Sequence, residues 1–174
     1  MIAILRLLGI MNATVWLGAA LFFTFGIAPA FFTPEMKHLL GDIYSGLVAQ
    51  MVLERYFMLH YCCSAIALIH QLAEWVYLGK RLHRFTFGLL VAIIVFSVAG
   101  GAVLTPKLKD YFKVRYSAQA SAVEKEEAKA AFRKWHGVSQ VMNLALLLCL
   151  ATFAVRVSLP PPNGTRFTTG KFRS

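Results

Sequence analysis

The stretch from residue 56 to residue 78 combines an apolar composition with side chains that can bind metals or protons. Its polar members recur three, four or seven positions apart, which places them on one face of an α-helix. The residues on this face are His60, Cys63, Ser64, His70, Gln71 and Glu74, together with the small apolar residue Ala67. Because such side chains are costly against lipid, we expect this face to turn toward other helices.

Two histidines on different apolar runs could hold a cofactor between helices. His60 lies about one turn inside its run, and His136 opens the last apolar run from the same side of the membrane, so we expect the two at similar depth. Paired imidazoles from facing helices suit a b-type haem in a bundle core. His70 is a weaker candidate ligand. The alternative is that His60 only hydrogen-bonds a neighbouring helix and that His136 only begins one.

Other polar residues predict contacts between helices. His70 is expected near the level of Asn12, and Glu74 could meet Arg6 or Arg156. Ser139 and Asn143, four residues apart, suit hydrogen bonds across helices in a bilayer, as do Cys63, Ser64 and Gln71 within the polar face.

No nucleophile, base and orienting group can be assembled into a catalytic constellation. Copper or another metal held by His60, Cys63 and His70 is a further hypothesis, weakened by the lack of a clear Met or Cys ligand set. The three cysteines, Cys62, Cys63 and Cys149, lie in apolar runs without metal-site spacing, which is typical of small buried hydrophobic residues.

The composition places these residues in a membrane. Of the 174 residues, 58% are hydrophobic and only 15% are charged, against about 25% charged in soluble domains. Four apolar runs, about 2–32, 56–78, 85–104 and 136–157, each suffice to cross about 30 Å of hydrocarbon. We therefore predict an all-α fold, an integral membrane four-helix bundle formed by one domain over residues 1–159.

Three segments outside the runs complete this prediction. Residues 33–55 are amphipathic and suggest an interfacial helix after the first span, broken around Gly41 or Gly46. Residues 122–134 are rich in Glu, Lys and Ala, which predicts a solvated helix before the fourth span. Pro106 is expected to close the third span, and residues 160–174 to form an extended, Pro-rich basic tail.

The net charge of +10 comes from basic residues between and after the apolar runs. That distribution favours contact with anionic lipid headgroups and excludes a nucleic-acid face with interleaved aromatic residues. Four spans place both termini on one side, and the basic residues there favour the cytoplasmic side.

Several short motifs resemble a known family. They are Trp16, Leu17 and Gly18; residues 29–32; Gly41, Tyr56 and Phe57; Pro106; and His136, Gly137, Val138, Ser139, Asn143 and Leu144. Over roughly residues 9–157 the chain resembles the domain of unknown function typified by transmembrane protein 205. That family is similar in layout to CopD-type copper-resistance domains and HemJ-type protoporphyrinogen oxidases. HemJ-type membership would imply haem and oxidase activity, but the first span here contains no histidine.

The resemblance implies a membrane fold without an established reaction. Our leading hypothesis is a small non-enzymatic accessory protein or subunit of a membrane complex, with other membrane subunits as partners. A haem-binding or redox protein that uses His60 and His136 is the alternative, and metal handling is a weaker one.

Overall fold

The computed structural model describes residues 2–78 and 83–159, and all its regular elements are helical. In chain order they are α1 (Ile2–Phe22), η1 (Phe23–Ile27), α2 (Ala28–Ala30), α3 (Pro34–Leu78), α4 (Arg84–Val98), η2 (Ala99–Leu104), α5 (Thr105–Tyr116) and α6 (Ala122–Ser158). Elements η1 and η2 are π-helical turns inside longer helices. The predicted tail, residues 160–174, lies outside the described residues.

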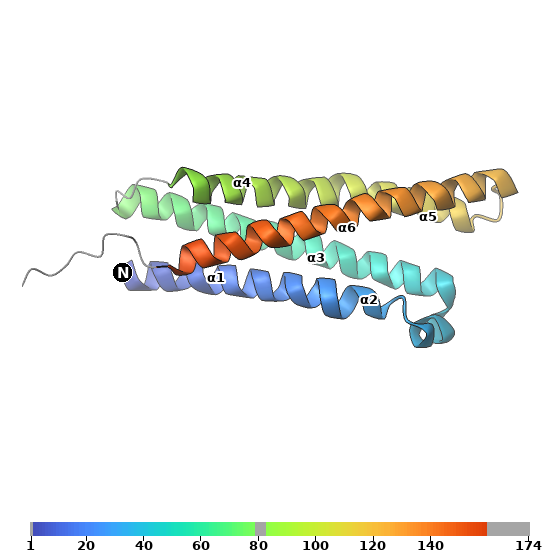
Figure 1. Cartoon of the computed structure of the whole chain (residues 1–174), viewed down its shortest axis with the longest axis horizontal. Coiled ribbons are helices and arrows are strands. Elements are labelled where there is room, and N and C mark those ends of the chain that lie inside the picture. Colours follow the sequence, from blue (N-terminus) through green and yellow to red (C-terminus); the bar gives the residue numbers. More distant parts are fainter. Residues whose placement is uncertain (1, 79–82, 160–174) are drawn as a thin grey trace, which may run out of the picture.

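Consecutive elements join into four long helical rods, each long and apolar enough to span a bilayer: Ile4–Ala30, Pro34–Tyr77, Arg84–Tyr116 and Ala122–Ser158. They lie side by side with alternating direction, and the N-terminus and the end of α6 lie at the same end of the bundle (Figure 1). The chain is thus a multi-pass, all-α membrane bundle, as its composition predicts.

The helices are longer than the hydrocarbon layer. Helix α6 has 37 residues, which at 1.5 Å each gives about 55 Å against about 30 Å of hydrocarbon. Its first turn is held by a capping box in which Ser121 and Glu124 exchange hydrogen bonds. The predicted helix before the fourth span is present and continues into that span as one rod.

The helix that contains the third span does not end at Pro106. The π-helical turn η2 lies directly before it, and the helix continues through α5 to Tyr116. A π-helical turn carries an extra residue and shifts the hydrogen-bond register, which accommodates a residue without a backbone donor. The carbonyl of Gly100 accepts from the backbone N–H of Thr105 and also, at 2.9 Å, from the Thr105 hydroxyl.

The predicted interfacial helix over residues 33–55 is only partly separate from the second span. The axis breaks at Gly41, where φ is 70° and ψ is 168°, and residues 42–78 then form one continuous rod. This backbone conformation is open essentially to glycine alone. Gly46, the other expected break, stays helical, and a Cβ atom there would meet the ring of Phe112.

The core lies where all four rods meet. Trp16, Leu90, Ile93 and Leu150, one or more from each of α1, α4 and α6, are completely buried. Alanines on α1, Ala13 and Ala20, are also fully buried and allow close approach of the neighbouring helices. Large apolar side chains such as Ile69 and Val141 face outward, where lipid would cover them.

Candidate functional site

The bundle opens into a cavity of about 750 Å³ at the end away from the start of α1 and the end of α6. We call it the aromatic cavity. It is lined by Phe23, Thr24, Ala28, Pro29, Phe31, Phe32, Lys37, Asp42, Ser45, Gly46, Ala49, Gln50, Leu53, Tyr56, Phe57, Phe96, Thr105, Leu108, Phe112, Arg115, Tyr116, Phe132, His136, Ser139, Gln140, Met142, Asn143 and Leu146. All four rods contribute, so the cavity exists only in the assembled bundle.

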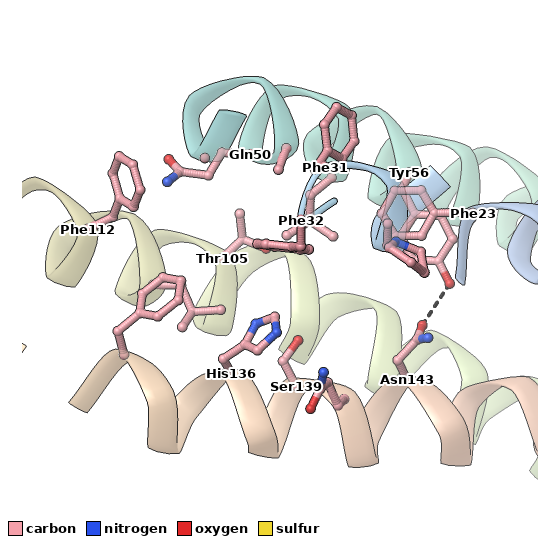
Figure 2. Close-up of a pocket in the computed structure, with 18 of the residues that line it drawn as sticks. Phe23, Phe31, Phe32, Gln50, Tyr56, Thr105, Phe112, His136, Ser139 and Asn143 are labelled. Atoms are coloured by element: carbon pink, nitrogen blue, oxygen red, sulfur yellow. Dashed lines mark hydrogen bonds between the residues drawn. The ribbon is translucent and has the colours of Figure 1, made fainter. Parts of the chain in front are cut away.

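A hydrogen-bonded trio forms the inner wall of the cavity. The Tyr56 hydroxyl donates to Oδ1 of Asn143 at 2.8 Å, and Nδ2 of Asn143 donates to the Thr24 hydroxyl at 2.9 Å (Figure 2). The ring of Phe23 stacks on Tyr56 with centroids 4.0 Å apart. These contacts join η1, α3 and α6 and fix three polar side chains at the inner end of the cavity.

The outer part of the cavity carries charge. Lys37 and Asp42 lie 3.6 Å apart as an exposed ion pair. The guanidinium of Arg115 lies over the ring of Tyr116 at 5.0 Å, and no carboxylate of the described residues pairs with it. Arg115 is therefore a cation available at the mouth of an apolar chamber.

The length of α6 indicates where the cavity lies along the bundle. From His136 to Ser158, helix α6 rises about 33 Å, which is close to the thickness of the hydrocarbon layer. The cavity lies along the first part of this stretch, from His136 to Leu146. Its ring stacks parallel to Phe132 at 5.8 Å and meets the edge of Phe32 at 6.3 Å, and Ser139 lines the cavity one turn further along α6.

His60 lies deeper and is completely buried. Its Nδ1 accepts a hydrogen bond of 2.8 Å from the indole Nε1 of Trp16. The rings of Tyr56 and Trp16 meet it edge-on at 4.4 and 5.7 Å. Tyr56 lies between His60 and the aromatic cavity, and His60 does not line that cavity.

The two histidines proposed as haem ligands are not at one depth. Helices α3 and α6 run in the same direction, and the Tyr56–Asn143 bond aligns them. On that alignment His60 and His136 are offset by eleven residues, or about 16 Å along the bundle. Axial ligands of one iron must face each other across the metal, so this arrangement does not form the expected pair.

The Trp16 contact also decides which nitrogen of His60 carries hydrogen. An indole N–H only donates, so Nδ1 of His60 must be the acceptor and a neutral ring holds its hydrogen on Nε2. A protonated Nε2 offers no lone pair to a metal. His60 is therefore held as a hydrogen-bond donor rather than as a metal ligand.

The remaining polar residues of α3 also face the interior. Cys63, Ser64 and Gln71 are buried. The carbonyl of Cys63, not its thiol, is engaged: it accepts from Nδ2 of Asn12 at 3.0 Å. Asn12 therefore meets the second span one turn past His60 rather than at His70.

His70 pairs with the backbone of α1. Its Nε2 lies 2.9 Å from the carbonyl of Leu5, and the ring fills the space beside Gly9, where a Cβ atom would overlap it. The expected metal group of His60, Cys63 and His70 does not form: among residues 2–78 and 83–159 no three His, Cys, Asp or Glu side chains cluster around a common point.

Arg6 and Arg156, the partners predicted for Glu74, also contact other groups. Arg6 donates to the carbonyl of Ser158 at 3.3 Å, and Arg156 lies 3.2 Å from Nε2 of His83 and over the ring of Phe85. Glu74 is half-buried near this end of the bundle. The three basic and imidazole groups tie α1, α4 and α6 together there.

Reasoning from the sequence missed most of the cavity. Thr24, Phe112, Phe132 and Arg115 lie on three rods, and none stands out in its own segment. The signal that existed was Asn143 at membrane depth, which indicated a polar contact but not its partners. The chamber depends on how the rods diverge, which no single segment encodes.

No curated protein and no solved structure matches the chain. One family does match, over residues 11–117, from α1 to the end of α5 and so over more than half of the chain. The chain belongs to the DUF4149 family, a domain of unknown function.

Proposed function

We propose that the protein binds a lipophilic amphiphile in the aromatic cavity, with the apolar body among the phenylalanines and an anionic head near Arg115. The observation that supports this most strongly is the chamber of about 750 Å³, whose lining includes nine phenylalanine and tyrosine side chains. Small-molecule sites are usually apolar chambers of about 300–1,000 Å³ with a few fixed polar groups.

The polar groups suit such a ligand. Arg115 has no carboxylate partner among the described residues, and a carboxylate or phosphate head would complete its fork of donors. His136, Ser139 and Gln50 reach into the chamber as further hydrogen-bonding groups (Figure 2). An apolar tail would displace no internal hydrogen bond, because the trio of Tyr56, Asn143 and Thr24 is already satisfied.

A photoactivatable fatty acid tests this proposal. The purified protein in lipid nanodiscs is irradiated with a diazirine-bearing fatty acid, and the adducts are mapped by mass spectrometry. We expect adducts on cavity residues such as Phe31 and Phe132, in competition with unlabelled fatty acid. Adducts spread evenly over outward-facing residues, with no competition, would overturn the proposal.

Two substitutions on the same helix provide a matched pair. Ser139→Trp places an indole in the cavity, while Val141→Trp, two residues on, places it on the lipid face, where Val141 is 72% exposed. We expect the first to abolish the cavity adducts and the second to leave them unchanged. Equal labelling of both variants contradicts binding in the cavity.

Arg115 provides a test of the head group. Arg115→Gln should weaken binding of the fatty acid by about tenfold or more, since hydrogen bonds to charged groups contribute about 1.5–3 kcal/mol. Binding of the corresponding fatty alcohol should change little. Arg133→Gln, on the exposed face of α6, is the control that keeps the charge count equal.

The role of a non-enzymatic accessory subunit, similar to transmembrane protein 205-type domains, stays a prediction. Co-purification from native membranes tests it, and a turnover reaction lost on changing His60 or His136 would contradict it. Haem binding predicts a Soret band that disappears in a His136→Ala variant. The 16 Å offset and the Trp16 bond give that alternative no support.

A further inference from the structure

A second cavity lies between α3 and the rod that contains η2 and α5, with a volume of about 380 Å³. We call it the lateral crevice. Met58 and Tyr61, which line it, are 56% and 40% exposed, so the crevice opens to the outside of the bundle, where lipid would cover it. The lining residues are Glu54, Phe57, Met58, Tyr61, Gly101, Thr105, Pro106 and Lys109.

The lateral crevice is separate from the aromatic cavity. Phe57 and Thr105 line both spaces, and they are only 7% and 5% exposed, so they form the wall between the two. The other six residues of the crevice do not line the aromatic cavity. An occupant of the crevice would therefore not compete with the amphiphile proposed for the aromatic cavity.

The inner end of the crevice is closed by the contact of Tyr61 with η2. The Tyr61 hydroxyl donates to the carbonyl of Ser97 at 3.4 Å, and a Cβ atom at Gly101 would overlap that hydroxyl. Between this contact and the outer end, Met58 and Pro106 provide an apolar surface. From Glu54 to Tyr61 helix α3 rises about 10 Å, which gives room for the first part of an acyl chain.

The outer end of the crevice lies where charged residues begin on both rods. Residues 56–73 of α3 and residues 85–106 of the neighbouring rod contain no Asp, Glu, Lys or Arg. Glu54 and Lys109 lie just beyond these two stretches and form an ion pair with each other. Charged side chains are costly within hydrocarbon, so this pair marks the edge of the hydrocarbon layer beside the crevice.

The ion pair can bind further groups. A lysine ammonium has three donors and a carboxylate has about four acceptor sites, so the one contact between Lys109 and Glu54 leaves donors and acceptors of both signs. The two side chains are 28% and 52% exposed, and both line the crevice. A ligand that matches this end carries an anionic acceptor and, a few bonds away, a cationic N–H donor.

We propose that the lateral crevice binds phosphatidylethanolamine, with one acyl chain along Met58 and the head group on the Glu54–Lys109 pair. The lipid phosphate accepts from the ammonium of Lys109, and the ethanolamine ammonium donates to the carboxylate of Glu54. Phosphatidylcholine has no N–H donor for Glu54, and phosphatidylglycerol brings no cation to it. The crevice volume lies within the range of about 300–1,000 Å³ typical of small-molecule sites.

The head-group preference of the wild-type protein tests the proposal. The purified full chain in detergent is titrated with phosphatidylethanolamine, phosphatidylcholine and phosphatidylglycerol of identical acyl chains, and native mass spectrometry gives each Kd. We expect phosphatidylethanolamine to bind about tenfold more tightly than phosphatidylcholine, since one hydrogen bond between charged groups is lost with the latter. Equal affinities for the three lipids, or tighter binding of phosphatidylglycerol, would overturn the proposal.

Glu54 provides the test of the recognition. Glu54→Gln removes the acceptor charge for the ethanolamine ammonium, so this variant should bind phosphatidylethanolamine and phosphatidylcholine equally well. Glu127→Gln, at an exposed position of α6, makes the same change in charge and should keep the wild-type preference. A wild-type preference in Glu54→Gln would contradict the assignment.

Photolabelling locates the bound lipid. Phosphatidylethanolamine with a diazirine in one acyl chain should form adducts on Met58 and Tyr61, in competition with the unlabelled lipid. Met58→Trp fills the crevice and should abolish these adducts. Met51→Trp is the matched control, because Met51 lies two turns earlier on α3, is 60% exposed and lines neither cavity. Equal labelling of the two variants would contradict binding in the crevice.

The two cavities can be tested independently of each other. Ser139→Trp fills the aromatic cavity and should leave the phosphatidylethanolamine adducts unchanged, while Met58→Trp should leave the fatty-acid adducts of the aromatic cavity unchanged. Loss of the phosphatidylethanolamine adducts in Ser139→Trp would contradict a separate lipid site in the crevice.

Discussion

Trp16 and His60 show how one buried contact limits the chemistry available to a residue. A histidine at membrane depth suggests a ligand or a proton carrier. The indole of Trp16 donates to Nδ1 at 2.8 Å, and both side chains are fully buried, so the imidazole is held in one orientation and one tautomer. Its remaining function is to donate from Nε2 into the interior.

Replacing Trp16 with Phe should destabilise the protein. The variant keeps an aromatic ring but leaves Nδ1 of His60 buried without a donor, at a cost of about 1–3 kcal/mol. Thermal unfolding in mild detergent measures the loss. Trp75→Phe is the control, because Trp75 is 52% exposed and should tolerate the change. Equal unfolding temperatures for the two variants would show that the bond contributes nothing.

The Tyr56–Asn143 bond should be detectable as a coupling energy. Tyr56→Phe and Asn143→Leu remove the two partners, and their double-mutant cycle isolates the interaction. Hydrogen bonds between membrane helices average about 0.6 kcal/mol with a maximum near 1.7, so we expect a coupling in that range. Tyr56→Phe combined with Thr152→Val, which lies outside the trio, should be additive.

Two local features of the backbone determine the course of the rods: a π-helical turn keeps one rod continuous, and a glycine breaks another. The π-helical turn η2 carries α4 into α5 past Pro106, and Gly41 alone interrupts α3. Both decide where the cavity walls lie, because α5 and the part of α3 after Gly41 line it. Substitutions in η2 or at Gly41 should therefore alter the stability of the bundle even where the added side chain is small.

Gly101 should be intolerant of alanine. Its Cβ would overlap the hydroxyl of Tyr61 and press on Phe57, and overpacking typically costs about 1–3 kcal/mol. Gly88→Ala is the matched control, since it lies in the same rod with nothing within 4 Å. Unfolding temperatures in detergent compare them. If Gly101→Ala were as stable as Gly88→Ala, the tight contact between α3 and η2 would be contradicted.

Gly41 should be intolerant for a different reason. No neighbouring atom lies within 4 Å of a Cβ there, so the cost of Gly41→Ala is that of the backbone at φ 70°, about 1–3 kcal/mol. Gly18→Ala, equally uncrowded but with helical backbone, should be neutral or slightly stabilising. A neutral Gly41→Ala would mean that the break at this position is not required.

The elements show which parts of the structure the sequence predicts. Apolar runs announce the four spans because hydrocarbon thickness sets a minimum length. The ends of the rods cannot be predicted in the same way. Pro106 suggests the end of a helix, but the preceding π-helical turn lets the helix continue. Gly46 suggests a break, but it stays helical and leaves space for the ring of Phe112. Local residue preferences cannot show these outcomes, because both depend on hydrogen bonds or neighbours that form only in the fold.

For the whole molecule, the divergence of the rods creates the site. Toward the start of α1 and the end of α6, the helices α1, α3, α4 and α6 meet around a packed core, and toward the other end of the bundle they line the aromatic cavity. The spacing of Ser139 and Asn143 predicts that they share a helix face, but no spacing in the sequence brings Phe112 or Arg115 beside them. Relative helix positions arise from packing over the full length of the bundle.

The arrangement of the rods also sets the membrane topology. Four spans with alternating direction place the α5–α6 connection on one side and the end of α6 on the other. In a cysteine-free variant, we expect single cysteines at Gln119 and at Leu159, both exposed, to react from opposite sides with a membrane-impermeant maleimide. Labelling of intact spheroplasts and of inverted vesicles measures this.

The same experiment tests the orientation that the basic residues predict. With the termini cytoplasmic, the cysteine at position 119 reacts in spheroplasts and the one at position 159 reacts only in inverted vesicles. The reverse pattern keeps the four spans but places the aromatic cavity on the cytoplasmic side. Labelling of both positions from one side would contradict the four-span arrangement, because an even number of crossings between position 119 and position 159 cannot be reconciled with α6 as one spanning helix.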